Sequence, residues 1–150
     1  MKTRTRMAAT ALMLASTFAA ASDGLIAIKS PHGAKATMDR FEATVKQRGL
    51  NVFARIDHAA GASGIGKTLR PTEVIIFGNP QGGTPFMACA QAVGIDLPLK
   101  ALVWEDASAQ VWLGYNDPVW LAKRHGVADC PAAANLGKAL AGLAGAATAP

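Results

Sequence analysis

The chain has 150 residues, of which 51% are hydrophobic and 17% charged, and it carries fifteen basic against ten acidic side chains. This length suits one domain with a single sizeable core. The basic residues are dispersed, without a run that could follow a phosphate backbone, so the composition argues against a nucleic-acid partner.

The N-terminus is predicted to be a removable secretory signal peptide over residues 1–21. Three basic residues among the first six precede a stretch without charge over residues 7–21, which ends on the small residues Ala19 and Ala21. Because this stretch is shorter than the roughly 20 apolar residues that span a bilayer, we expect cleavage after Ala21 and no membrane contact afterwards. The mature protein is then periplasmic or secreted, and an uncleaved N-terminal anchor is the alternative.

The first part of the mature chain is predicted to form a strand, a helix and a second strand. Residues 25–29 alternate weakly as a strand, which ends before Pro31 because proline cannot donate to a ladder. Apolar residues in the segment 34–48 recur at spacings of four, three and four, the period of one helical face. Gly49 supplies the left-handed turn that ends this helix, and residues 51–57 alternate as the second strand. The helical stripe consists of Ala34, Met38, Phe41 and Val45.

A third strand and a second helix are predicted next. Residues 72–77 hold four consecutive apolar residues, the pattern of a strand that is covered on both faces. The glycine-rich turn 78–83 follows, and Thr84 as N-cap with Pro85 at the first helical position predicts a helix that runs to Val93. Alternatively, the backbone amides of this turn bind a small anion at the helix N-terminus.

Residues 101–105 and 110–115 are predicted to pair as a β-hairpin. The cross-strand neighbours in the expected register are Trp104 with Val111 and Val103 with Trp112. Two further helices are expected, one over residues 118–125 that ends at Gly126, and an alanine-rich one from Pro131 to about Gly142 that frays into the tail.

The order of these elements indicates an α+β fold. Strands come singly and then as a hairpin, with helices between them, which fits an antiparallel or mixed sheet with helices on one face better than a doubly wound parallel sheet. We therefore predict a single two-layer domain over residues 22–130, followed by an alanine-rich C-terminal helix and tail over residues 131–150.

Cys89 and Cys130 are the two cysteines of the chain. Export would place them in an oxidising compartment, where such a pair is usually bridged, so we predict a disulfide. The alternative is two buried thiols that act as small hydrophobic side chains. The sequence has no C-x-x-C redox motif.

The segment from Gly61 to Thr68 matches the phosphate-loop pattern G-x-x-x-x-G-K-[ST]. In a nucleotide-binding protein a helix follows the lysine, and its N-terminus meets the phosphates. Pro71 disfavours helical geometry at Arg70, so we interpret the segment as a flexible glycine-rich connection. Nucleotide binding is the least favoured function of the chain.

The three histidines lie at intervals that no zinc site requires, so neither a metal site nor a cofactor is predicted. His58 lies at a strand end beside the glycine-rich segment. It is the candidate general base of a small periplasmic enzyme in which Arg70 or Lys67 stabilises an anion. His32 and His125 are expected to be structural or solvated, His125 because the C-terminus of a helix favours a cation.

Seven short motifs follow one another between residues 55 and 126. They are RIDHAAG (55–61), LRPTE (69–73), IFGNP (76–80), DLPLK (96–100), VWED (103–106), YNDP (115–118) and RHG (124–126). In this order they resemble the domain of unknown function 302 family over about residues 25–127, with the alanine-rich tail outside the shared region. The resemblance implies a compact α+β fold and a homodimer, and it implies no established reaction, substrate or cofactor.

Polar residues of these motifs lie at predicted strand ends and loops, where binding sites concentrate. We therefore expect a non-catalytic exported domain that binds a small molecule or a partner protein through one face, and that tolerates replacement of the residues on that face. The candidate ligand-binding residues are His58, Arg70, Asn79 and Tyr115.

Overall fold

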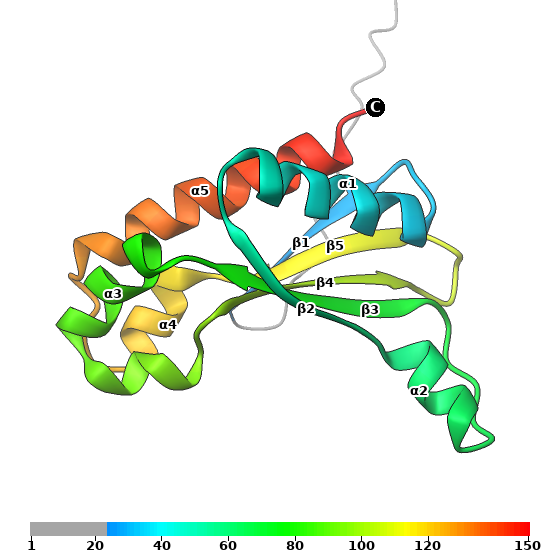
Figure 1. Ribbon diagram of the computed structural model, residues 1–150, viewed down its shortest axis with the longest axis horizontal. Coiled ribbons are helices and arrows are strands. Elements are labelled where there is room, and N and C mark those ends of the chain that lie inside the picture. The colour runs from blue at the N-terminus through cyan, green and yellow to red at the C-terminus, as the bar shows by residue number, and fades with distance from the viewer. Residues whose placement is uncertain (1–23) are drawn as a thin grey trace, which may run out of the picture.

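A computed structural model describes residues 24–150. The predicted signal peptide, residues 1–21, lies outside the described residues. A five-stranded sheet carries the two long helices on one face (Figure 1). Every pair of neighbouring strands is antiparallel, so the predicted α+β fold with an antiparallel sheet is confirmed, and the two long helices lie on one face as expected.

The strand order in the sheet is β1-β5-β4-β3-β2, so the first strand pairs with the last. The strands are β1 (Leu25–Ser30), β2 (Asn51–Asp57), β3 (Thr72–Gly78), β4 (Leu99–Glu105) and β5 (Val111–Asn116). The helices are α1 (Ala34–Gln47), α2 (His58–Gly64), α3 (Pro80–Cys89), the 3-10 helix η1 (Gln91–Ile95), α4 (Pro118–Arg124) and α5 (Pro131–Thr148).

The main core lies between the sheet and α1, and it confirms the predicted helical stripe. Met38, Phe41 and Val45 are fully buried, and the ring of Phe41 meets the ring of Phe77 edge-on with centroids 5.3 Å apart. Burial of side chains of this size contributes roughly 1.5–3 kcal/mol each. Gly49, with φ of +70°, ends the helix region in the left-handed conformation that the sequence predicts.

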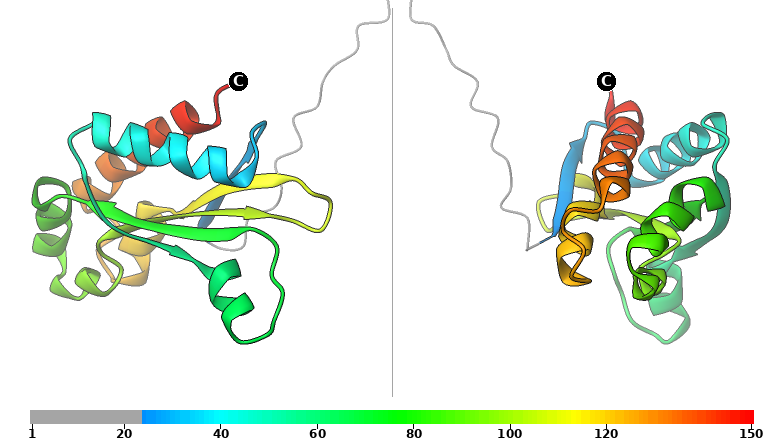
Figure 2. Two further views of the ribbon diagram at one scale, coloured as in Figure 1. Left: turned by 45° about the vertical axis from the view of Figure 1, so that its right-hand side comes forward. Right: turned by 90° about the vertical axis from the view of Figure 1, so that its left-hand side faces the viewer.

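α5 is longer than predicted and belongs to the core. It lies beside α1 over the same face of the sheet (Figures 1 and 2) and buries Leu140, Leu143 and Ala147 there. The carbonyl of Ala149, just after the helix, accepts a hydrogen bond from Arg40 at 2.9 Å and contacts His32 Nε2 at 2.8 Å. The alanine-rich segment is therefore held by tertiary packing instead of fraying into a tail.

α3 begins earlier than predicted. The side chain of Asn79 accepts a hydrogen bond from the amide of Gly82 at 2.9 Å, so Asn79 is the N-cap and Pro80 the first helical residue. Thr84 and Pro85 lie inside the helix. The sequence holds two start signals of the same kind, and the first of them begins the helix.

The glycine-rich segment forms a helix where we predicted a flexible connection. α2 begins with Asp57 as N-cap, since its carboxylate accepts a hydrogen bond from the amide of Ala60 at 2.9 Å. Gly66 then adopts a φ of +70°, and residues 67–70 have no regular structure. The helix therefore precedes Lys67, and the absence of a helix after it agrees with our prediction.

The hairpin register differs by one residue from the prediction. Trp104 pairs with Trp112, and Val103 with Leu113. The cause is Asp106, whose carboxylate accepts hydrogen bonds from the amides that follow it in the turn at 2.8 and 3.0 Å. This places Asp106 itself opposite Gln110 and shortens the loop to three residues.

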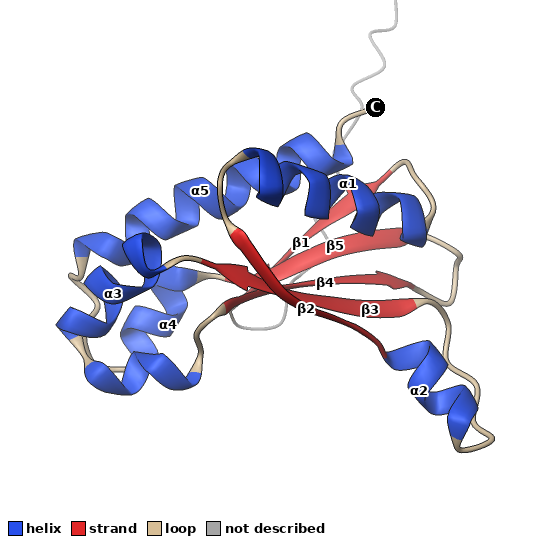
Figure 3. Cartoon of the chain, viewed as in Figure 1, coloured by secondary structure: helices blue, strands red, loops and turns tan. Residues whose placement is uncertain are grey.

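The sheet places the remaining helices at its two ends (Figure 3). α2 projects from the end where β2 stops and β3 begins, on the side away from α1 and α5 (Figure 1). α3, η1 and α4 gather at the opposite end and pack on the first part of α5. A site at one end of the sheet would therefore lie beside α2, and a site at the other end would lie among α3, η1, α4 and α5.

Candidate functional site

An apolar pocket of about 320 Å³ lies between α3, α5 and the end of the sheet where β2 and β4 begin and β3 stops. None of the lining residues has a charged side chain, and the polar ones are Asn79 and Thr84. The lining residues with large apolar side chains are Leu50, Phe53, Met87, Leu97, Leu99, Leu136, Leu140 and Leu143. The pocket can therefore accept an apolar molecule without leaving a charge unpaired.

The wall formed by α5 is the same stripe that fills the core. Leu136, Leu140 and Leu143 recur at spacings of four and three and are at most 9% exposed. Ala139 lies beside this stripe and is exposed, so it marks the mouth of the pocket. α3 approaches this wall closely, because a Cβ atom added at Gly82 would lie 3.4 Å from the Cδ2 atom of Leu136.

Phe53 reaches the pocket through an irregularity in β2. The pairing of β2 with β3 shifts its register between Val52 and Ala54, which leaves Phe53 as the extra residue of a β-bulge. Bulges change the direction of a side chain and are frequent beside functional sites. Phe53 is 57% exposed although it is a large apolar residue, and it contributes to the lining.

Cys89 and Cys130 connect the two helical walls of the pocket. Cys89 is the last residue of α3, and Cys130 directly precedes α5. Their Cα atoms are 6.1 Å apart, which is within disulfide distance. The predicted pairing thus joins the two helices that face each other across the apolar space.

Asn79 is the one candidate ligand-binding residue that lies at this pocket. Its side chain and its carbonyl both accept from the amide of Gly82, and the carbonyl also accepts from the amide of Gly83 at 3.1 Å. The amides of Gly82 and Gly83, which belong to the turn that we considered for anion binding, therefore already donate hydrogen bonds to Asn79.

The other three candidates do not share a face with Asn79. His58 and Arg70 are exposed at the end of the sheet where α2 projects, whereas Asn79 follows the opposite end of β3. Tyr115 is 4% exposed inside the main core, where burial raises the pKa of its hydroxyl. A single ligand-binding face formed by all four residues is therefore not present.

The residues of the enzyme hypothesis have no partners that would activate them in the described part of the chain. His58 makes no hydrogen bond or ion pair with another side chain there, and the same holds for Lys67 and Arg70. His125 does contact a carboxylate, with its Nε2 atom 2.6 Å from Asp96 Oδ2, and this contact joins α4 to η1.

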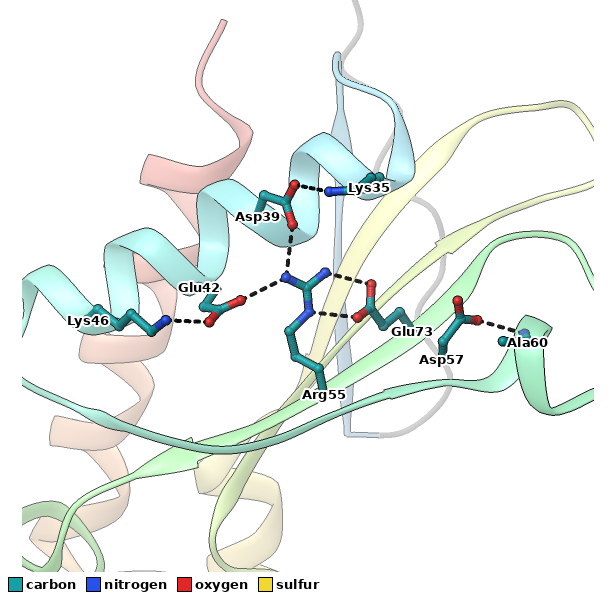
Figure 4. A network of polar contacts seen from close by, with 8 residues as sticks. All are labelled: Lys35, Asp39, Glu42, Lys46, Arg55, Asp57, Ala60 and Glu73. Carbon is teal, nitrogen blue, oxygen red and sulfur yellow. Dashed lines mark hydrogen bonds and ion pairs between the residues drawn. The ribbon is translucent and has the colours of Figure 1, made fainter.

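Arg55 lies at the centre of the most extensive polar network (Figure 4). Its Nε and Nη2 atoms donate to the two carboxylate oxygens of Glu73 at 2.6 and 2.9 Å. Its Nη1 atom donates to Asp39 at 2.9 Å and to Glu42 at 2.7 Å. These acids, Glu73 most of all, raise the pKa of Arg55, and the hydrogen bonds from Lys35 and Arg55 lower the pKa of Asp39.

A second and more polar pocket, of about 480 Å³, lies against this network. Its charged lining residues are Lys35, Arg55, Asp57 and Glu73. Each has a partner within the fold, since Lys35 binds Asp39, Arg55 binds Glu73, and Asp57 caps α2. Each of these charges therefore has a structural role, and Arg55 also joins α1 to the sheet through Asp39 and Glu42.

The face of the sheet opposite α1 and α5 carries an aromatic pair. The rings of Trp104 and Trp112 stack with centroids 6.3 Å apart, and Lys29 Nζ lies 5.4 Å from the ring centroid of Trp112. The indole of Trp112 donates to Asp106 at 2.8 Å, and this bond lowers the pKa of Asp106. Ile56, on the edge strand of the same face, is 44% exposed.

Residues 24–150 contain no cluster of three or more histidine, cysteine, aspartate or glutamate side chains that could hold a metal ion. No helix within these residues is both long and apolar enough to cross a bilayer.

Sequence reasoning selected polar side chains and so missed the apolar pocket. Leu50 with Phe53, Met87, and Leu97 come from three separate segments, and only the folded chain brings them together. A local signal was present at Phe53, because a phenylalanine on the polar side of an alternating strand has no core to enter.

A model of the family described as domain of unknown function DUF302 matches residues 26–143. The match extends well into α5, beyond the region that the motifs suggested. A crystal structure of an uncharacterized conserved protein DUF302 from Bacillus stearothermophilus superposes with a TM-score of 0.74 at 21% identity, covering 84% of this chain and 99% of that one. This likeness shows the shared fold.

Curated relatives are similar over a shorter stretch. The fluoride-specific ion channel FluC 1 of Brucella suis biovar 1 is 53% identical over 102 residues, which are 68% of this chain and 40% of the relative. The protein of the same name from Brucella abortus biovar 1 is also 53% identical over 102 residues, 38% of its length. The chain thus spans about two fifths of the relatives that it matches.

Proposed function

Because the chain belongs to the DUF302 family, whose description assigns no activity, we propose its function from the site itself: a non-catalytic domain that binds an apolar small molecule between α3 and α5. The observation that carries this proposal is the apolar pocket, whose lining has no charged side chain. Binding sites for small molecules are mostly apolar cavities with a few polar groups, and Asn79 and Thr84 are the polar groups here.

The size of the pocket supports a small ligand. An apolar cavity of about 150 Å³ stays free of water and holds benzene, and this pocket has about twice that volume. Phe53, exposed at its rim, gains a partner when the pocket is filled. The ligand-binding role therefore moves from the four polar candidates to this pocket, with Asn79 as the residue in common.

A titration with the uncharged fluorophore N-phenyl-1-naphthylamine tests the proposal. We expect saturable fluorescence enhancement with the full chain and its loss in Ala139→Trp, because the indole would close the mouth without entering the core. Ala141→Trp is the matched control, since Ala141 is equally exposed on α5 but outside the lining. Binding that survives in Ala139→Trp would contradict the proposal.

Fluoride is a second ligand for this test, because the curated relatives are named fluoride-specific ion channels. We expect sodium fluoride and sodium chloride at equal concentration to give the same melting temperature. A ligand that binds the folded state raises the melting temperature. A higher melting temperature in fluoride than in chloride would therefore indicate that the domain binds fluoride and would contradict the apolar ligand.

We also propose that the domain works outside the cytoplasm, in the periplasm or after secretion. Two observations support this: the signal-like sequence of residues 1–21 and the disulfide distance between Cys89 and Cys130. Mass spectrometry of the envelope fraction should find a protein that starts at Ser22 and has no free thiol. An intact cytosolic chain that starts at Met1 would contradict this location.

A second candidate function is partner binding, with a second copy of the chain as the partner. α2 has seven residues, two of which are Gly61 and Gly64, and none of its residues is buried. A helix this short is marginally stable in water unless it packs against another surface. Ile65, directly after it, is 76% exposed. Contact with a second copy of the chain would cover α2 and Ile65 and stabilise the helix.

Light scattering during gel filtration tests self-association. We expect a dimer for the unmodified chain and a monomer for Ile65→Asp. Ile95→Asp is the matched control, because Ile95 is 75% exposed but lies in η1 at the other end of the sheet. A dimer that persists in Ile65→Asp, or a monomeric unmodified chain, would exclude α2 as the dimer contact.

A further inference from the structure

We infer that the ligand of the apolar pocket is an aliphatic monocarboxylate, with its chain between α3 and α5 and its carboxylate at the guanidinium of Arg48. This inference rests on the proposed function and adds the chemical class of the ligand. It joins an apolar pocket whose lining has no charge and a nearby arginine that has no counter-ion among residues 24–150.

The pocket fixes the apolar part of the ligand. If about 150 Å³ accommodates the six carbons of benzene, a volume of about 320 Å³ accommodates roughly twelve carbons. The lining contains no acidic side chain that would repel a carboxylate and no basic side chain that would bind one inside. The charged end of the ligand therefore stays at the rim, in contact with water.

Arg48 is not a lining residue, but it lies against Gly142, the residue before the lining residue Leu143. It caps the C-terminus of α1 and precedes Leu50 by two residues. Its Nη1 atom lies 3.4 Å from the position that a Cβ atom on Gly142 would occupy. Gly142 is the neighbour of Leu143 on α5, so the guanidinium rests on the helix that forms the pocket wall.

Arg48 differs from Arg40, Arg55 and Arg124, whose guanidinium groups have partners, and it shares the lack of a partner within residues 24–150 with Arg70, which lies at the opposite end of the sheet from the pocket. Arg55 and Arg124 bind carboxylates, and Arg40 donates to carbonyls at the end of α5. Arg48 has no carboxylate within 4.0 Å and no side-chain hydrogen bond in residues 24–150. A guanidinium forms its strongest hydrogen bonds with a carboxylate, often through two parallel bonds. An incoming carboxylate thus finds a donor that is not already engaged.

The test compares two ligands of equal chain length, dodecanoate and 1-dodecanol, by calorimetric titration of the full chain below the micellar concentration. We expect dodecanoate to bind about fivefold more weakly to Arg48→Gln than to the unmodified chain, the effect of losing one exposed charge pair. The affinity for 1-dodecanol should not change. Lys123→Gln, which removes one exposed charge on α4 at a residue outside the lining, should bind both ligands like the unmodified chain.

The outcomes separate this inference from the proposed function. Equal effects of Arg48→Gln on both ligands, or none on dodecanoate, would overturn the carboxylate assignment while the binding of 1-dodecanol still supports an apolar site. If neither ligand binds and Ala139→Trp changes nothing, the proposed function fails together with the inference.

Discussion

Replacing Arg55 with methionine tests whether the polar network holds α1 on the sheet. The change keeps the aliphatic stem and removes four hydrogen bonds to Glu73, Asp39 and Glu42. Exposed ion pairs contribute about 0–1 kcal/mol, and breaking a buried pair costs about 3–5 kcal/mol. The side chain of Arg55 is 26% exposed and its partners are 19–44% exposed. We therefore expect a loss of about 2–3 kcal/mol in the free energy of unfolding at neutral pH.

This loss should depend on pH. Hydrogen bonds from Lys35 and then Arg55 lower the pKa of Asp39, and those from Lys46 and then Arg55 lower the pKa of Glu42. A carboxylate with a lowered pKa stabilises the fold at any pH above its unfolded-state pKa, near 4. The stabilisation disappears as the pH falls through the folded-state pKa. The difference between Arg55→Met and the unmodified chain should therefore shrink below about pH 4.

Urea unfolding followed by tryptophan fluorescence, at pH 7 and near pH 2.5 with the cysteines oxidised, measures both quantities. Lys35→Met is the control, because Lys35 is 86% exposed and its pair with Asp39 contributes about 0.5 kcal/mol or less. An equal loss at the two pH values, or a loss at pH 7 no larger than that of Lys35→Met, would refute the reasoning.

Three further substitutions have definite expectations. Changing Cys89 and Cys130 together to serine should lower the free energy of unfolding by up to about 4 kcal/mol, the chain-entropy value for a separation of 41 residues. The double change should also weaken N-phenyl-1-naphthylamine binding, because α3 and α5 are no longer joined. An unchanged urea midpoint would contradict the first expectation. Gly114→Ala would place a Cβ atom 2.9 Å from the ring of Trp104, so we expect a loss of about 1–3 kcal/mol and an altered tryptophan emission spectrum. Asn79→Ala should cost about 1 kcal/mol through the lost N-cap of α3, measured by thermal melting; a neutral result would mean that the cap is dispensable.

The parts of the fold that the sequence predicts are those set by local pattern. The stripe of Met38, Phe41 and Val45 has the helical period, and these residues of α1 are buried against the sheet. The strands are recognisable from alternation, as in residues 51–57, or from a short apolar run, as in residues 72–77. The start of α3 was mispredicted because two cap signals compete within six residues, and local pattern does not rank Asn79 against Thr84.

The candidate site was less predictable, because it is a product of tertiary packing. Tyr115 stood out as a polar residue near a strand end, yet in the folded chain its ring lies among the core residues. The expectation that its replacement spares folding therefore changes, and Tyr115→Ala should destabilise like other large core truncations, by about 3–5 kcal/mol. Apart from Phe53, the apolar pocket gives no sequence signal, because Leu50 and Leu97 look like any other core leucine.

The pairing of β1 with β5 sets the order in which the sheet can be completed. Leu25 lies opposite Asn116, so β1 finds its hydrogen-bonding neighbour only after all five strands have been synthesised. A chain that emerges with its N-terminus first exposes the free edge of Leu25–Ser30 for most of that time. Unpaired edges invite association with other chains, and contacts between distant residues form slowly. This edge of the sheet therefore stays incomplete until the last strand has been synthesised.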